Sequence, residues 1–217
     1  MSAKDIIIKP IGKKDADRIC KKHHYSGKVV QNSQVHFGVF YKDNCEGVLQ
    51  FGPSLDKSKI VHLVKGTKFY NFLELNRMAF SEKLPRFSES RAISICMKML
   101  KKNYPHLDWI VTFADGTQCG DGTIYRASNF VLTGIRKNES LRKHKVTGEI
   151  IQKLTAHTRA ISSKVFTRDY DPLPGYQFRY MYFLKPELIK NLIVPTIHFD
   201  TIKEMGIGMY KGKKRNN

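Results

Sequence analysis

The 217-residue sequence predicts an α/β fold, a single domain in which helices flank a mixed central sheet. Apolar residues recur at helical spacing in two long segments of the chain. Between these segments lie short stretches that are apolar or that alternate between apolar and polar residues, as strands do. Hydrophobic residues make up 41% of the chain, so it can bury one sizeable core, and no internal repeat divides it.

The expected elements begin with a helix at residues 13–24, whose apolar face contains Ile19 and Cys20, and a hairpin that turns at residues 42–44. The clearest helix covers residues 88–103, where apolar residues repeat every three or four positions. In chain order we expect a helix at 13–24, strands at 35–41, 46–51 and 72–80, a helix at 88–103, a strand at 108–114, a short helix at 123–128 and strands at 130–136 and 177–184.

The charge of the chain is the first indication of its partner. Lys and Arg number 38 and Asp and Glu 19, which gives a net charge of +19. This excess predicts a polyanionic partner, because each neutralised phosphate releases condensed counterions. An anionic membrane surface or mere composition are the alternatives, but the basic residues do not gather on one amphipathic helix. We therefore expect double-stranded DNA as the partner and no membrane, and the oligomeric state is left open.

Two basic segments are the expected DNA contacts. Residues 138–174 interrupt the rhythm of helices and strands and are interpreted as an insertion on the sheet, and residues 211–217 as a short, mobile tail. No stretch approaches the ~20 apolar residues of a membrane helix, which favours a cytosolic protein. The candidate DNA-binding residues are Arg142, Lys143, Lys145, Lys211 and Lys213.

The most unusual segment is FADGTQCGDGTIY at residues 113–125. Asp115 stands at the carboxyl end of the strand expected at 108–114, the edge at which ligands of open α/β sheets bind. The glycines after it let a backbone approach a ligand closely. The alternative is a loop in which Asp115 only caps a turn. The crowding of polar residues and glycines favours a site with Asp115 as a catalytic residue.

Tyr125 and the pair Asn129-Phe130 form a Tyr-x-x-x-Asn-Phe pattern that resembles the Y-x-x-x-G-F motif of the GNAT acyltransferases. Asn replaces the glycine, and Asn is the next best residue for a left-handed helix terminus. The resemblance implies a GNAT-like fold in which Tyr125 lies beside the sulfur of an acyl carrier and acts as a general acid. The alternative is a tyrosine buried in the core.

The segment LPRFSES at residues 84–90 stands where GNAT enzymes bind the pyrophosphate of coenzyme A with a Q/R-x-x-G-x-G/A loop. Arg86, Ser88 and Ser90 surround the start of a helix, which either serine can also cap, and together they predict an anion site for a small donor. The glycines that let the backbone approach a pyrophosphate are absent, which argues against coenzyme A, so the cofactor is left unknown and an acyl-CoA-type donor is kept as one alternative.

Asn76 and Arg77, on the strand expected at 72–80, are further candidates for binding the donor. Polar groups on a central strand need partners. Arg77 either anchors an anionic ligand or pairs with an acid.

His24 and Tyr25 end the first expected helix, in a region that lines the acceptor side of the cleft in GNAT folds. There His24 can relay a proton and Tyr25 can stack on a base. The alternative is a carboxyl-terminal helix cap, where histidine is also favoured. His24 and Asp115 are also compatible with two ligands of a transition metal such as iron, but no third ligand is evident and no metal site is predicted.

Four segments together resemble the Mom family of phage DNA-adenine modification proteins: HHYSG (23–27), LELNRMAF (73–80), LPRFSES (84–90) and NYPHLDWIVTFADGTQCGDGTIY (103–125). The resemblance covers most of the chain. It implies a phage-encoded, GNAT-related enzyme in the cytoplasm of the bacterial host. Such an enzyme attaches a carbamoylmethyl (methylcarbamoyl) group to N6 of adenine in DNA, which protects phage DNA from host restriction.

Under this hypothesis Asp115 is the base that assists the weakly nucleophilic exocyclic amine, His24 relays or orients the proton, and Tyr125 is the general acid. The target adenine has to leave the base stack, and Tyr25 is its aromatic partner. Two other functions are considered. A GNAT-type N-acetyltransferase acting on RNA or protein would be expected to keep the glycine loop. A non-enzymatic DNA-binding protein would have no use for an acid beside those glycines.

Overall fold

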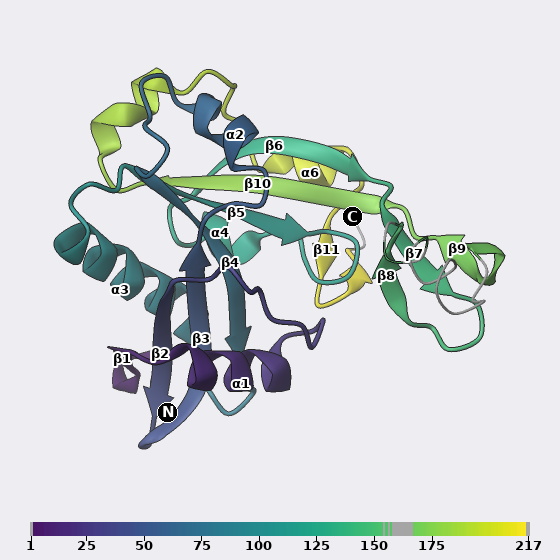
Figure 1. The fold of residues 1–217 in the computed structure, drawn as a ribbon, viewed down its shortest axis with the longest axis horizontal. Helices are drawn as coiled ribbons and strands as arrows, with labels where there is room; N and C mark the ends of the chain where they lie inside the picture. The colour runs from purple at the N-terminus through teal and green to yellow at the C-terminus, as the bar shows by residue number, and fades with distance from the viewer. Residues whose placement is uncertain (1, 154, 156, 158–166, 216–217) are drawn as a thin grey trace. The chain divides into compact units, whose positions relative to one another are not determined.

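The computed structural model describes residues 2–153, 155, 157 and 167–215 (Figure 1). The chain divides into two compact units. The first comprises residues 1–113, 122–133 and 179–199, and the second comprises residues 114–121, 134–178 and 200–217. The expectation of one domain spanning the whole chain stays a prediction.

A mixed sheet forms the centre of the first unit, and three of its strands, β5, β6 and β10, continue along the chain into the second. Seven strands pair among the described residues, in the order β1-β2-β3-β4-β5-β10-β6. β1 to β4 are antiparallel to one another, whereas β4 and β5 are parallel, so the predicted α/β class with a mixed sheet is confirmed. The strands are β1 (Ile7–Pro10), β2 (Val35–Tyr41), β3 (Asn44–Gly52), β4 (Phe72–Phe80), β5 (Trp109–Asp115), β6 (Val131–Asn138) and β10 (Gly175–Phe183).

The strongest sequence patterns locate their elements well. β4 and helix α3 (Ser88–Asn103) have the predicted bounds, and α1 (Lys13–His23) ends one residue earlier than expected. The hairpin between β2 and β3 turns at Lys42 and Asp43, whose φ values of 47° and 63° fit the type I′ turn that joins twisted strands. β1 is absent from the expected elements, because this edge strand leaves most of its side chains exposed and carries no alternating pattern.

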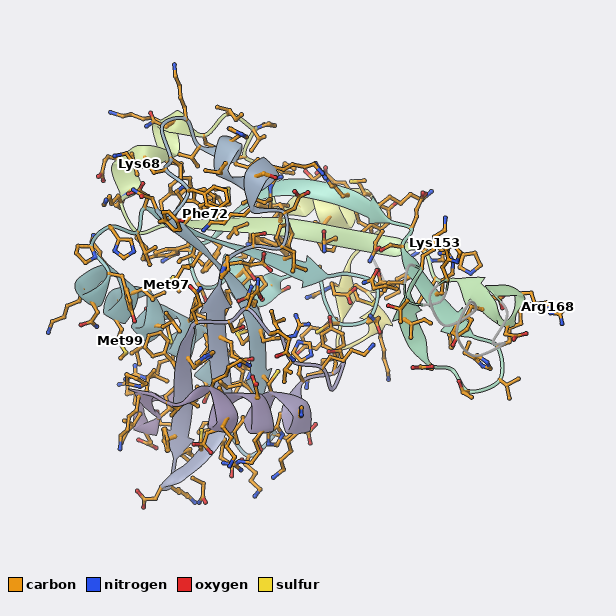
Figure 2. All side chains as sticks on the ribbon, viewed as in Figure 1. Lys68, Phe72, Met97, Met99, Lys153 and Arg168 are labelled. Carbon is orange, nitrogen blue, oxygen red and sulfur yellow. The ribbon has the colours of Figure 1, made fainter. Side chains whose placement is uncertain are left out.

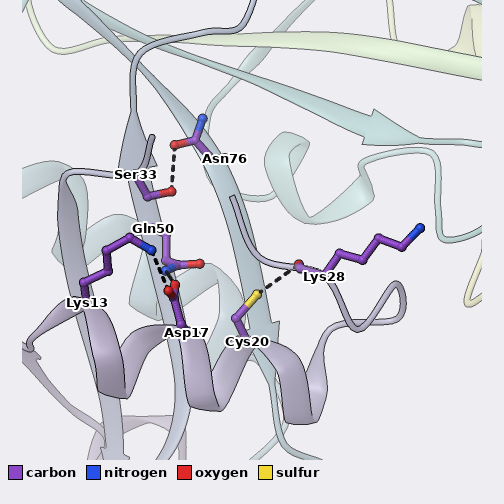
Figure 3. Close-up of polar contacts among 7 residues, drawn as sticks. All are labelled: Lys13, Asp17, Cys20, Lys28, Ser33, Gln50 and Asn76. Carbon is purple, nitrogen blue, oxygen red and sulfur yellow. Dashed lines mark hydrogen bonds and ion pairs between the residues drawn. The ribbon is translucent and has the colours of Figure 1, made fainter. Parts of the chain in front are cut away.

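Helix α1 packs on β2, β3 and β4, and Figure 3 shows it in front of these strands. Cys20 of α1 lies in one buried cluster with Val48 of β3, as the predicted apolar face requires. Asp17 on the same helix accepts hydrogen bonds from Lys13 and, at 2.9 Å, from the buried amide of Gln50 on β3. Burial acts to raise the pKa of Asp17, but these hydrogen bonds outweigh it and lower the pKa. The carboxylate therefore ties the helix to the sheet.

Helix α3 buries a face that is shifted from the expected one. The repeat of apolar residues in 88–103 predicts an apolar face that includes Ile95 and Met99, but both are only half-buried. Ser88 and Ser90 do not cap the helix, as was expected of one of them, because Phe87 occupies the cap position. A separate core cluster contains Phe72 of β4 and Trp109 of β5, whose rings stack with centroids 4.3 Å apart, and Figure 2 labels Phe72 and Met97 inside this unit. The residues that α3 buries are Ser88, Ala92, Ile93, Cys96, Met97 and Leu100.

The parallel strands β4 and β5 pair over a short length. The pairing runs from Phe72 and Trp109 to Glu74 and Val111, after which Thr112 donates a hydrogen bond to the carbonyl of Leu75 at 3.2 Å. Beyond this point no further pair joins the two strands in the described residues. The backbone of β4 after Leu75 is therefore not covered by a partner strand on the β5 side.

The second unit contains two small sheets. Three strands pair in the order β8-β7-β9 and bury Ile151 and Tyr170, and the hairpin of β11 and β12 pairs Met209 with Lys214. The predicted basic insertion at 138–174 belongs to this unit, although 154, 156 and 158–166 lie outside the described residues. The basic tail expected at 211–217 contains β12 in its described part, and its mobility stays a prediction. The elements are β7 (Leu141–His144), β8 (Ile150–Gln152), β9 (Tyr170–Pro172), α6 (Asp200–Glu204), β11 (Met209–Tyr210) and β12 (Lys213–Lys214).

Short helical segments complete the described chain. None of the helices in the described part of the chain has the length and apolarity needed to cross a membrane. The short segments are η1 (Ala3–Asp5), α2 (Lys57–Ile60), η2 (Val61–Leu63), α4 (Thr123–Arg126), η3 (Thr167–Asp169) and η4 (Pro186–Asn191).

Candidate donor pocket and catalytic residues

A pocket of about 750 Å³ lies in the first unit beside the amino-terminal half of α3. Its walls come from η1, from α3 and from the turn that follows α4. Four cationic side chains line it, and none of the described residues around it is acidic, so the pocket is suited to an anionic ligand. The cations are Lys4, Arg86, Arg91 and Lys98, and the hydroxyls of Ser90 and Ser94 lie among them.

The loop that leads into α3 enters the helix through a strained residue. Phe87 has φ 70°, a left-handed conformation that costs a residue with a side chain roughly 1–2 kcal/mol. Its ring is 64% exposed, lines the pocket and lies 4.9 Å from the guanidinium carbon of Arg86. Strain of this kind concentrates at ligand sites.

The two serines of this loop have different surroundings. The hydroxyl of Ser88 is fully buried and donates to the carbonyl of Pro85 at 2.6 Å, so it holds the turn and does not line the pocket. The hydroxyl of Ser90 donates to the carbonyl of Phe87 at 3.2 Å and faces the pocket. Of the predicted donor-binding residues, Arg86 and Ser90 are thus brought together.

The turn after α4 supplies the opposite wall. Asn129 has φ 62°, the left-handed conformation that its place in the Tyr-x-x-x-Asn-Phe pattern requires, and it lines the pocket. Tyr125 is 8% exposed and its ring packs between those of Phe130 and Tyr180, with centroids 5.5 and 5.4 Å away. The phenol that lines the pocket is Tyr182 of β10.

Several residues that line the pocket were not predicted from the sequence. Arg91, Ser94 and Lys98 follow one another at helical spacing on the polar face of α3, and this periodicity was the available signal. Lys4 lies near the amino terminus and Tyr182 on β10, far from α3 in the sequence, and no local pattern links them to α3.

Asn76 and Arg77 hold the loop that follows α1. The side-chain oxygen of Asn76 accepts the hydroxyl of Ser33 at 3.2 Å, as Figure 3 shows. The guanidinium of Arg77 donates to the carbonyls of Lys28 at 3.2 Å and Asn76 at 2.8 Å. Neither residue lines the pocket. Burial raises the pKa of Glu74 on the same strand, against hydrogen bonds with Ser54 and Asn76.

His24 and Tyr25 form an aromatic pair at the end of α1, with ring centroids 4.4 Å apart. His24 is the carboxyl-terminal cap residue of the helix, as the alternative interpretation expected. Its Nδ1 accepts the amide of Ser26 at 3.2 Å, so a neutral imidazole carries its proton on Nε2. The ring of Tyr25 is 51% exposed, which suits it to contact a large ligand.

In the second unit, Asp115 organises the turn at the end of β5. Its Oδ1 accepts the amides of Thr117 at 2.9 Å and Gln118 at 3.2 Å, and its Oδ2 accepts Nε2 of Gln118 at 3.0 Å. A Cβ on Gly116 would lie 2.3 Å from the ring of Phe178, so this glycine permits close packing against β10. Burial, with a smaller effect of the Asp115 charge, raises the pKa of the Cys119 thiol.

The predicted DNA-binding residues also lie in the second unit. Arg142 of β7 donates to the carbonyls of Glu139 and Leu141 at 2.8 Å, and Lys145 pairs with Asp171 at 3.7 Å. Lys143, Lys211 and Lys213 are exposed. In the part of the chain that the structure describes, no cluster of three or more His, Cys, Asp or Glu residues could hold a metal ion.

The structural neighbours of the chain are acetyltransferases. A GNAT family acetyltransferase from Elizabethkingia anophelis with acetyl-CoA bound is 13% identical, with a TM-score of 0.46 over 82% of this chain and 98% of that one. The ribosomal-protein-S18-alanine N-acetyltransferase from Escherichia coli is 11% identical, with a TM-score of 0.47 over 82% and 94%.

The sequence comparison is more specific. The Mom protein family model matches residues 5–200, and the chain belongs to this family, as its four segments predicted. Methylcarbamoylase mom from Escherichia phage Mu is 32% identical over 199 residues, which cover 88% of this chain and 80% of that protein. The family match ends before β11 and β12.

Proposed function

We propose that this protein is a DNA-modification enzyme that adds a carbamoylmethyl (methylcarbamoyl) group to N6 of adenine in phage DNA and so protects it from host restriction. The observation that carries the proposal is the 32% identity to a methylcarbamoylase over 88% of the chain. The net charge of +19 supports double-stranded DNA as the substrate, inside the bacterial host cell.

The pocket beside α3 is proposed to hold the anionic part of the group donor. Four cations without an acid, next to the start of a long helix, favour a ligand with several negative charges. A phosphate-rich acyl-CoA-type donor fits that chemistry. Ser90 and Asn129 would orient its polar groups, while Ser88 supports the loop from inside.

The chemistry requires that the N6 amine of adenine lose a proton as its bond to the transferred group forms. The amine is a poor nucleophile because its lone pair is delocalised into the ring, so a carboxylate that accepts the proton speeds the reaction. We assign this part to Asp115, with His24 relaying or orienting the proton. The exposed ring of Tyr25 is proposed to contact the extruded base. As the new bond to N6 forms, the bond between the transferred carbon and the donor breaks, and Tyr125 would be the general acid that protonates the leaving group, although its ring is buried among aromatic neighbours.

Mass spectrometry of nucleosides from DNA of cells that express the protein tests the proposal. We expect a carbamoylmethyl adduct of deoxyadenosine that is absent from cells expressing the Asp115→Asn variant. An acetylated RNA or protein in place of this adduct would establish the rival transferase activity. Unmodified DNA, RNA and protein would leave only a DNA-binding function.

A further inference from the structure

Two aromatic side chains are displayed to solvent on the connection between β3 and β4. Tyr70 is 76% exposed and Phe69 is 46% exposed. Their rings meet edge to face, with centroids 5.9 Å apart. Exposed rings that are clustered in this way mark binding surfaces more often than isolated apolar residues do.

The same connection is strongly basic. Residues 57–70 contain four lysines and neither Asp nor Glu. Lys59, Lys65 and Lys68 are exposed, and Lys59 also pairs with Asp56 at 2.9 Å. The ammonium of Lys57 lies 4.3 Å from the centroid of the Phe69 ring and 4.8 Å from that of Tyr70. Desolvation in this position lowers the pKa of Lys57.

The segment that leads to the rings is joined to the core of the first unit. Trp109 donates its indole N–H to the hydroxyl of Thr67 at 3.0 Å, and the amide of Lys65 donates to the carbonyl of Asn191 at 2.8 Å. Val64, which precedes them, is buried in the core cluster of Phe72 and Trp109. The chain just before the two rings is therefore anchored to the core, which lowers the backbone entropy lost on binding.

We propose that this stacking surface, formed by Lys57, Lys59, Lys65, Lys68, Phe69 and Tyr70, binds an unpaired stretch of DNA. Bases would stack on the rings of Phe69 and Tyr70, and the lysines would contact the phosphates on either side. Charge complementarity selects a polyanion, and the exposed rings select one whose bases are accessible. The inference rests on the proposed function, because extruding an adenine unstacks the bases beside it.

Binding of single-stranded oligothymidylate and of a duplex of equal length, each titrated at several salt concentrations, tests the proposal. The Phe69→Ala/Tyr70→Ala double variant should bind the single strand about tenfold more weakly or worse, with an unchanged salt slope, and should bind the duplex much as before. Tyr70→Phe, which keeps the ring, should bind as the wild type does. Leu55→Ala is the matched control, because Leu55 is 90% exposed and apolar but has no ring.

The contribution of the lysines to single-strand binding can be tested separately. Lys65→Met/Lys68→Met should lower the slope of log affinity against log salt for the single strand by roughly 1.4, about 0.7 per phosphate contact. Should the double alanine variant fold poorly, Tyr70→Ala alone decides the matter, because a side chain this exposed contributes little to stability.

Unchanged single-strand binding in the alanine variants overturns the proposal. Self-association of the wild type that these variants abolish would also overturn it, because a second copy would then occupy the surface. Adenine modification of duplex DNA is measured in parallel. Loss of single-strand binding without loss of modification would leave the proposed function standing, and absence of modification in the wild type would remove the proposed function alone.

Discussion

Arg215, near the carboxyl end, forms an ion pair with the buried carboxylate of Asp121. Nε of Arg215 lies 2.7 Å from Oδ2 of Asp121, whose side chain is 3% exposed. Asp121 also donates its amide to the carbonyl of Met209 at 2.9 Å, and Gly212 donates to the carbonyl of Cys119 at 2.7 Å. Within the second unit, the end of the chain therefore holds the glycine-rich loop that begins at Asp115. The family match ends at residue 200 and so does not include this carboxyl-terminal segment.

We predict that Arg215→Met lowers the stability of the second unit by about 2 kcal/mol, because it leaves a buried carboxylate without its cation. Thermal unfolding and hydrogen exchange of residues 115–121 measure the effect. Lys214→Met is the control. It also removes one positive charge from this segment, but it leaves the ion pair between Arg215 and Asp121 intact. Equal behaviour of the two variants would show that the ion pair is not needed to order the loop.

Donor binding should depend on the polar face of α3. Arg91→Gln/Lys98→Gln is expected to weaken the binding of coenzyme A, used as a probe, by about tenfold for each cation removed. Lys101→Gln lies on the same helix outside the pocket and should leave binding unchanged. Calorimetry provides the measurement. If the wild type does not bind coenzyme A, the acyl-CoA-type donor is excluded. If the variant binds as tightly as the wild type, the pocket is not the donor site.

Phe87 should show opposite effects on stability and binding. Phe87→Gly removes the left-handed strain and is expected to raise stability by about 1 kcal/mol, while it removes the ring from the pocket wall. Phe87→Ala removes the ring but keeps the strain, and so serves as the control. Denaturant unfolding together with coenzyme A binding separates the two effects. A Gly variant no more stable than the Ala variant would contradict the assignment of strain.

The sequence predicted the elements with strong periodicity and missed those fixed by distant neighbours. α3, β4 and the left-handed Asn129 needed only local patterns. The pocket could not be assembled in the same way, because Lys4 and Tyr182 reach α3 only through the fold. The role of Ser88 was equally hidden, since nothing local distinguishes a hydroxyl that faces a pocket from one that donates to the carbonyl of Pro85.

The stability of the protein should depend on pH through Glu74. Burial raises its pKa above the ordinary 4.5, so the folded state binds this proton more tightly than the unfolded state does. Its contribution to stability is therefore fully present below about pH 4.5 and is lost as the pH rises through the folded pKa. Glu74→Gln mimics the protonated form and should stabilise the protein at pH 7 but not at pH 4. Glu82→Gln, at an exposed site, is the control. An Asn76 amide that prefers the ionised carboxylate would reverse the sign and make Glu74→Gln destabilising at pH 7.

A catalytic Asp115 can be distinguished from a structural one by the Asp115→Asn variant. Asp115→Asn keeps an oxygen that can accept the amides of Thr117 and Gln118, so the turn should survive and the melting temperature should change little. What the variant loses is the ability to accept a proton from the adenine amine, a contribution of about 100-fold or more. It should bind DNA as the wild type does and yield almost no modified adenine.

Gln118→Ala is the matched control for Asp115→Asn. It removes the hydrogen bond from Nε2 of Gln118 to the carboxylate, as Asp115→Asn also does when a donating Nδ2 replaces Oδ2, but it leaves the carboxylate in place. If Asp115 only holds the turn, both variants should lose stability and activity together. If Asp115 accepts the proton, Gln118→Ala should remain active while Asp115→Asn does not, and the two should melt within a few degrees of each other. A stable and active Asp115→Asn variant would move the proton acceptor elsewhere, with His24 as the next residue to replace.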